Sequence, residues 1–307
     1  MTTLTDQTHE GAAEAAAPTS NRDAAREIAV FLGTTFALTA LSTLVGLAED
    51  VDVSRIDEAS GLGQAAMYTQ AFFPFVGVLA ARASTAKERR TSWGFRRPTG
   101  RALGIAWALG LLCPVVAAAL CLLAGATSVD AGAAGPMLPL GLTALVLPYV
   151  LLAVGEDLGW RGLLVTRLAQ VSGPRVVVLV SGLAWAMFHW PLMIWLGGVP
   201  DDVPTIFGIA SFTLGATALG ALLANMQLRW GLWPGVLMHA VTNATLYHVL
   251  APVTEENANG GYLAGEVGIV GGLVTAVAAL AWWKVAPLVR TTDGGTAARR
   301  TTPRRKA

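Results

Sequence analysis

The chain has 307 residues, of which 54% are hydrophobic and only 13% are charged, and its formal net charge is +1. Because a soluble domain carries about a quarter charged residues, this composition excludes a soluble globular protein and indicates a polytopic membrane protein. The two cysteines, Cys113 and Cys121, are eight positions apart in one apolar run. Such a pair is separated by about 12 Å along a helix axis, which is too far for a disulfide. No CxxC pair is present, so redox chemistry is not indicated.

The two ends of the chain differ in composition from its centre. Residues 1–24 are polar and rich in Ala and Thr, which predicts a disordered cytoplasmic tail. Residues 290–307 form a second cytoplasmic tail that carries the basic run ARRTTPRRKA. Beside a membrane domain such a run is expected to attract anionic lipid, so nucleic acid is not an expected partner. The region between the tails, 25–289, is the predicted membrane domain.

Apolar segments of about 20 residues, the length that crosses a typical bilayer, recur along this domain. We therefore predict an all-α, polytopic fold with about eight transmembrane helices. The fourth helix is expected to continue past Arg161 as an amphipathic cytoplasmic extension. The expected spans lie near 28–48, 64–82, 102–125, 137–156, 176–197, 205–226, 232–251 and 263–286.

The charges of the connecting loops alternate along the chain. Acidic residues follow the first, third, fifth and seventh expected spans, whereas arginine and lysine follow the second, fourth, sixth and eighth. The positive-inside rule then places both termini in the cytoplasm, which requires an even number of spans. The sequence thus predicts a multi-pass protein of the cell membrane.

The stretch 155–162 places two acids and an arginine at the inner end of the fourth expected span. Charged groups are costly inside a bilayer, so an intramembrane carboxylate pair indicates a functional site. Asp157 and Arg161 are four positions apart and share a helix face, where they can neutralise each other. Glu156, about 100° around the helix, is left as the acid without a local partner.

Three further polar residues are expected inside the spans. His189 falls in the fifth span, and His239 and Asn243 fall in the seventh. The four-residue spacing of His239 and Asn243 stacks their side chains on one helix face. His248 follows nine residues after His239, points to the opposite side and is left out of the site. One glutamate, two histidines and one asparagine on three helices could converge on a single cavity.

Such a set of side chains suits hydrolysis. A glutamate beside a histidine can take a proton from water, and a His–Asn pair can stabilise the oxyanion of a tetrahedral intermediate. Alternatively, Glu156, His189 and His239 could hold a zinc ion with an open water position, so Zn²⁺ is a candidate cofactor. Taken singly, each residue is also explained by a hydrogen bond between helices or, for Glu156, by a position at the membrane interface.

The polar residues form three motifs on separate helices, and these resemble the motifs of the CAAX-protease and bacteriocin-processing family (CPBP, or Abi) of intramembrane proteases. The resemblance covers about residues 137–251 and implies a helical membrane protein whose site faces the cytoplasm. The motifs in chain order are Glu156-Asp157-x-x-x-Arg161, Trp185-x-x-x-His189 and His239-x-x-x-Asn243.

Carried over by position, the resemblance implies a role for each residue. Glu156 and His189 are implied to activate the attacking water, and His239 and Asn243 to stabilise the oxyanion. Arg161 is implied to orient the acidic pair. The family is often labelled metalloprotease, yet a metal-free glutamate mechanism has been argued for it, so the resemblance leaves the metal open.

Two positions depart from the family's usual pattern. A second glutamate is usual where this chain has Asp157, and the shorter side chain is expected to change how the acid pairs with Arg161. A phenylalanine is usual where this chain has Trp185. That change is expected to alter packing rather than chemistry.

We interpret the sequence as a hydrolase, an intramembrane endopeptidase that cleaves a membrane-associated peptide or membrane-protein substrate, with its active site on the cytoplasmic side. The Ala- and Arg-rich composition is typical of a bacterial protein. Nothing indicates a prenylated substrate, so a bacteriocin-like precursor is a candidate. The alternatives are a non-catalytic binding protein, for immunity or scaffolding, and a proton-coupled small-molecule transporter. Transporters commonly contain internal repeats, and none is evident here.

Overall fold

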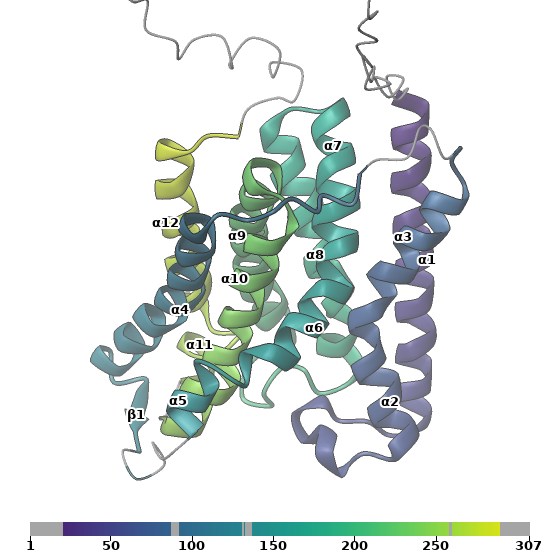
Figure 1. The fold of residues 1–307 in the computed structure, drawn as a ribbon. Coiled ribbons are helices and arrows are strands. Elements are labelled where there is room, and N and C mark those ends of the chain that lie inside the picture. The colour runs from purple at the N-terminus through teal and green to yellow at the C-terminus, as the bar shows by residue number, and fades with distance from the viewer. Residues whose placement is uncertain (1–20, 87–91, 131, 133–136, 258–259, 289–307) are drawn as a thin grey trace, which may run out of the picture.

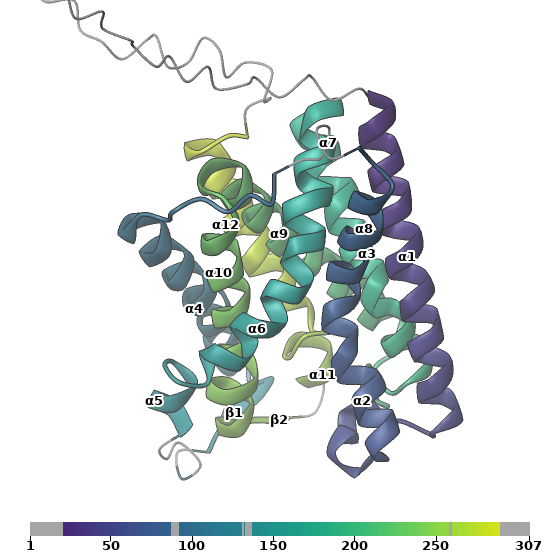
Figure 2. The same ribbon diagram turned by 45° about the vertical axis from the view of Figure 1, so that its right-hand side comes forward.

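The computed structural model describes residues 21–86, 92–130, 132, 137–257 and 260–288, which form a bundle of helices (Figures 1 and 2). The expected tails lie outside the described residues, except that residues 21–24 form the start of α1. The helices in chain order are α1 (Asn21–Ala48), α2 (Gly61–Thr69), α3 (Phe73–Ala83), α4 (Gly100–Leu123), α5 (Met137–Gly141), α6 (Val146–Asp157), α7 (Thr166–Val171), α8 (Pro174–Trp195), α9 (Thr205–Trp230), α10 (Leu232–Ala244), α11 (Gly260–Leu263) and α12 (Ile269–Val285).

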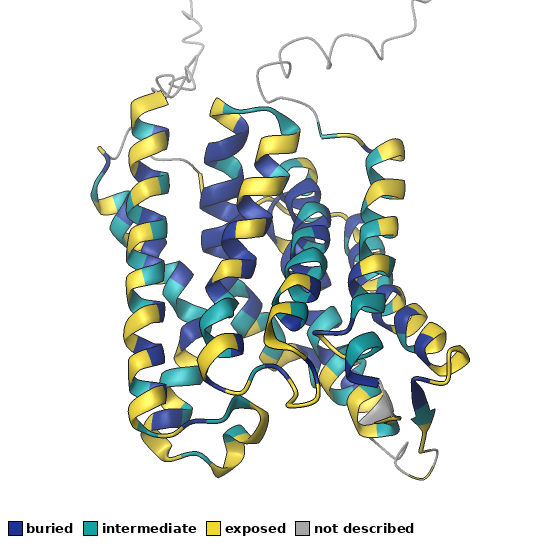
Figure 3. Ribbon diagram, turned by 180° about the vertical axis from the view of Figure 1, so that it is seen from behind, coloured by how far each residue is buried: buried dark blue, intermediate teal, exposed yellow. Residues whose placement is uncertain are grey.

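Five helices of the described chain are long and apolar enough to cross a membrane. Leucine, valine and isoleucine side chains are exposed along the helices, and Figure 3 shows buried residues on the faces that turn towards the interior of the bundle. Exposed apolar surface of this extent marks contact with lipid or protein, so the membrane protein expected from the composition is confirmed. The five helices are Asn21–Ala48, Gly100–Leu123, Pro139–Val171, Pro174–Trp195 and Thr205–Trp230.

Helices occupy each of the eight expected ranges, but four of these ranges hold short or interrupted helices, among them 137–156, where residues 142–145 separate α5 from α6. The span expected at 64–82 consists of α2 and α3, which are separated by a 3-10 turn. The span expected at 232–251 is α10 followed by the π-helical segment Thr245–Leu250. α12, in the last expected span, has only 17 residues. The count of eight spans therefore stays a prediction.

The fourth expected helix continues past Arg161, but not as the amphipathic extension that was expected. At Leu158 α6 passes into a π-helical segment, Leu158–Val165, which leads into α7. All eight residues of this segment are buried, because α1, α3 and α9 pack around it. π-helical turns are rare in proteins, but those that occur are often found at functional sites. The charged end of the helix is thus enclosed by other helices.

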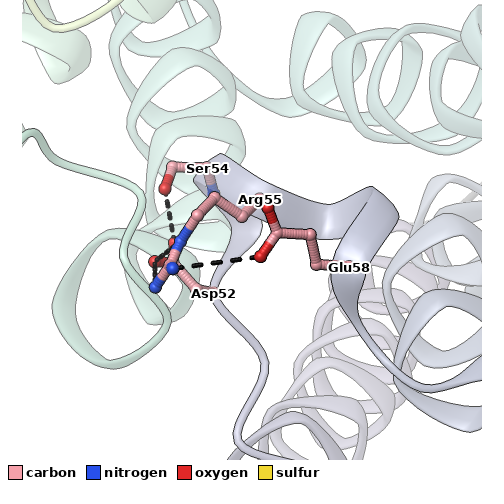
Figure 4. A network of polar contacts seen from close by, with 4 residues as sticks. All are labelled: Asp52, Ser54, Arg55 and Glu58. Atoms are coloured by element: carbon pink, nitrogen blue, oxygen red, sulfur yellow. Dashed lines mark hydrogen bonds and ion pairs between the residues drawn. The ribbon is translucent and has the colours of Figure 1, made fainter.

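Acidic loops lie at the end of the bundle opposite to the start of α1 and the end of α12 (Figure 1). The loop after α1 contains a 3-10 turn, Val53–Glu58. Asp52 caps the start of this turn and accepts hydrogen bonds from the backbone N–H and the hydroxyl of Ser54 (Figure 4). Arg55 pairs with Asp52 at 3.1 Å and with Glu58 at 3.9 Å. The Ser54 hydrogen bonds and the Arg55 charge hold the pKa of Asp52 below its ordinary value.

A short antiparallel ribbon at this same end is the one exception to an all-α structure among the described residues. β1 (Thr127–Val129) pairs with β2 (Thr254–Glu256), and Ser128 lies opposite Glu255. The ribbon connects the end of α4 to the segment after α10. Inside the bundle, Cys113 and Cys121 are free and buried.

Close packing of α8 against α9 depends on Gly182. A Cβ atom at this position would lie 2.9 Å from the backbone Cα of Thr217 in α9, so the two helices would have to separate. Gly182→Ala is therefore expected to lower the free energy of unfolding by about 1–3 kcal/mol, measured by thermal unfolding in detergent. Gly104→Ala in α4 is the matched control, because no atom lies within 4 Å of that Cβ position. Equal stabilities of the two variants would contradict this packing.

Candidate active site

The two acids of the first motif lie at the end of α6, where the helix turns into the π-helical segment. Both are buried, but not equally: 9% of Glu156 is exposed, against 0% of Asp157. Burying a carboxylate is costly unless a cation or hydrogen-bond donors surround it. Different partners stabilise the two buried carboxylates.

Asp157 pairs with the arginine that the helical spacing predicted. Its Oδ1 atom is 2.8 Å from Nη1 of Arg161, and both side chains are buried. The same Oδ1 lies 3.5 Å from Nδ1 of His239, on α10. Asp157 therefore faces two groups that can carry positive charge, one on its own helix and one on α10.

Glu156 is paired with a tryptophan of α8. The indole Nε1–H of Trp185 donates a hydrogen bond to Oε2 of Glu156 at 2.8 Å. The face of the same indole carries the guanidinium of Arg161, whose Cζ is 3.9 Å from the ring centroid. The expectation that Trp185 matters only for packing is therefore incomplete, because a phenylalanine has no N–H to donate.

Both candidate histidines lie beside the same indole. The ring of His239 meets Trp185 edge-on at 5.2 Å between centroids, and the ring of His189 does so at 5.9 Å. Nδ1 of His189 is 3.0 Å from the backbone carbonyl of Trp185. A carbonyl only accepts, so Nδ1 is the donor of this hydrogen bond, and in the neutral ring Nε2 is then the acceptor. Trp185 is thus the common neighbour of Glu156, Arg161 and both histidines.

Asn243 is less closely associated with the site than the other candidate residues are. It lies half-buried on α10, one turn beyond His239. No hydrogen bond joins it to another candidate residue in the described part of the chain. His248, which was left out of the site, instead forms a hydrogen bond with Tyr149 at 3.2 Å. The structure therefore groups Glu156 and the two histidines around Trp185 and leaves Asn243 next to His239.

The zinc alternative can be tested on the positions of the side chains. Among the described residues, no group of three or more His, Cys, Asp or Glu side chains is arranged to hold a metal ion. The contacts with Trp185 leave Oε1 of Glu156 and Nε2 of His189 open. The set Glu156, His189 and His239 is therefore not gathered as a ligand group among the described residues, and the zinc alternative stays a prediction.

Two contacts of the site were missed by sequence reasoning. One is the hydrogen bond from Trp185 to Glu156, and the other is the approach of His239 to Asp157. A signal for the first was present, because a buried indole N–H usually has a hydrogen-bond partner. No comparable signal existed for the second, since it depends on how α10 packs against α6.

The fold and the site define an α-helical membrane protein whose interior holds an acid–arginine–histidine cluster. A family model described as type II CAAX prenyl endopeptidase Rce1-like matches residues 138–245, about a third of the chain, and this segment contains every residue of the cluster. The resemblance to the CAAX-type membrane proteases is therefore confirmed. No curated protein matches the chain.

Proposed function

We propose that the protein is an intramembrane endopeptidase that hydrolyses a peptide bond by means of a water molecule activated by Glu156 and His189. The observation that carries the proposal is that the two acids have different surroundings. Asp157 is fully buried and neutralised by Arg161, whereas Glu156 keeps some exposure and is held by a neutral donor. A general base needs this combination, because it has to reach water and must not be tied to a fixed cation.

Activation of the water is assigned to two side chains. Oε2 of Glu156 already accepts the Trp185 hydrogen bond, so Oε1 is the oxygen that takes a proton from the attacking water. Nδ1 of His189 is directed to a carbonyl, which leaves Nε2 to accept a hydrogen bond from the same water. The water oxygen attacks the carbonyl carbon of the peptide bond, and the proton on Glu156 then passes to the leaving amine.

Stabilisation of the oxyanion is assigned to His239 and Asn243. An imidazolium at His239 is neutralised by Asp157 through Nδ1 and donates from Nε2 to the oxyanion, while Asn243 donates from its side-chain amide. With His239 protonated, the positive charges of His239 and Arg161 match the negative charges of Asp157 and Glu156. Charges inside a membrane protein pair with one another in this way.

A cytoplasm-facing site in an eight-span topology accompanies this mechanism. The start of α1 and the end of α12 lie at the same end of the bundle (Figures 1 and 2), which supports an even number of spans. Arg175, in the first turn of α8, and Arg229, in the last turn of α9, lie at this end of the bundle, whereas Asp52 and Glu255 lie at the other end. The positive-inside rule places the basic end in the cytoplasm. The bilayer of a cell membrane and a membrane-associated peptide or protein are the expected partners.

Peptide cleavage and metal content, measured on one detergent-purified sample, test the proposal. The sample is incubated with a broad peptide library that includes prenylated and unprenylated members, beside a mock purification from cells that lack the protein. New peptide termini without stoichiometric metal are expected. Cleavage with one zinc ion per chain would keep the protease but overturn metal-free activation of the water. Absence of cleavage across the library would overturn the proposal in favour of a binding protein or a transporter.

A further inference from the structure

Trp185 makes contacts in the cluster that go beyond packing. Among the described hydrogen bonds, the one to the Glu156 side chain comes from its indole N–H. Trp185 as a whole is 5% exposed, so this N–H lies in largely dehydrated surroundings. A hydrogen bond to an ionised acceptor in such surroundings is stronger than one between neutral groups.

The same indole also decides where Arg161 lies. The guanidinium rests on the face of the ring at 3.9 Å from the centroid while it pairs with Asp157. Stacking of a cation on an indole is favourable, and more so when the pair is desolvated. Trp185 thus binds Glu156 by its edge and Arg161 by its face. The arrangement gives each acid a partner of its own.

We propose that Trp185 is a positioning residue that fixes the Glu156 carboxylate, so that Oε1 is directed to the water and Oε2 is withdrawn from the reaction. This inference rests on the proposed protease function. Orientation of a reacting group accounts for a large share of enzymatic rate enhancement. Loss of the indole N–H should therefore slow the chemical step, whereas binding of the substrate should change little.

Trp185→Phe removes the N–H and keeps an aromatic ring. We expect kcat for peptide cleavage to fall by about 10- to 100-fold, the effect of losing a hydrogen bond to a charged group, while KM stays within about twofold of wild type. The matched control is Trp160→Phe. Trp160 is 1% exposed and packs against Phe31 and Phe188, and its Nε1 has no hydrogen-bond partner in the described residues. The same substitution there loses ring volume without losing a hydrogen bond.

Site-specific replacement of Trp185 by benzothienylalanine separates the N–H from the ring. This analogue has sulfur in place of the N–H and keeps the bicyclic ring, and with it the contact to Arg161. A fall in kcat equal to that of Trp185→Phe is the expected result. Wild-type kcat in the analogue protein would overturn the inference, because ring volume would then explain the Phe variant. A kcat loss in Trp160→Phe as large as that in Trp185→Phe would overturn it as well.

The outcome for Trp185 can be distinguished from the outcome for the protease function. If the wild-type protein cleaves peptides and the Trp185 variants cleave at the same rate, only the positioning role fails. If the wild-type protein does not cleave any peptide of the library, the protease function itself fails.

Discussion

Glu156→Gln is expected to lower kcat/KM for peptide cleavage by about 10²- to 10⁴-fold, the contribution of a positioned general base. Glutamine has nearly the same shape and its amide oxygen can still accept the hydrogen bond that Trp185 donates to Oε2. It cannot take a proton from water. The loss should therefore appear in the chemical step, and the thermal unfolding temperature in detergent should stay close to that of wild type.

Glu255→Gln is the matched control for this prediction. Glu255 lies exposed in β2, outside the cluster, and the same change of charge there should leave kcat/KM as it is. Both variants are compared by mass-spectrometric rates of product formation at equal protein concentration. Wild-type rates in Glu156→Gln would exclude Glu156 as the base and would leave the charged cluster as a structural or binding element.

Arg167→Met is expected to lower the free energy of unfolding by about 3–5 kcal/mol, because it leaves an acid buried without its cation. Nε of Arg167 is 2.7 Å from Oε2 of Glu27, and both side chains are 0% exposed. Glu27 lies in the first turns of α1 and Arg167 lies in α7, so this pair joins the first helix to the segment that follows the acidic motif. Unfolding in detergent, followed by circular dichroism, measures the change.

The opposite substitution and the double variant show whether the pair is the cause. Glu27→Gln should cost less than Arg167→Met, because Arg167 also donates to Gln170 at 2.9 Å. Glu27→Leu combined with Arg167→Met removes both charges and should recover much of the lost stability. Arg175→Met, at an exposed arginine of α8, is the control and should be close to neutral. Additive losses in the double variant would contradict a coupled pair.

The helical membrane fold could be predicted from the chain because its cause is local. A run of about 20 apolar residues must form a helix in a bilayer, since every backbone polar group has to be satisfied within the segment. The Asp157–Arg161 ion pair was predictable for the same reason, because a spacing of four residues places both side chains on one helix face. The order of the three motifs along the chain was also readable, and it led to the family that residues 138–245 match.

Contacts between helices could not be read in this way. Arg167 is one of the arginines that follow the fourth expected span, yet it is buried against Glu27, 140 positions earlier in the chain. Trp185 was expected to alter packing, and its hydrogen bond with Glu156 spans 29 positions. Each contact depends on the rotation and depth of two helices relative to each other, and no periodicity within one helix specifies either quantity.

The sequence by itself determined the class of protein, the places of its helices and the candidate residues of its site. It left open whether Glu156, His189 and His239 form a metal site, because residue types and spacing on separate helices are compatible with a zinc ligand set and with a water-activating set. Only the tertiary structure decided how these side chains meet. It places Trp185 beside all three, with its indole N–H on one oxygen of Glu156 and its ring against both histidines. The physical reason is that packing of α6, α8 and α10 sets the distances between side chains, which spacing along one chain does not.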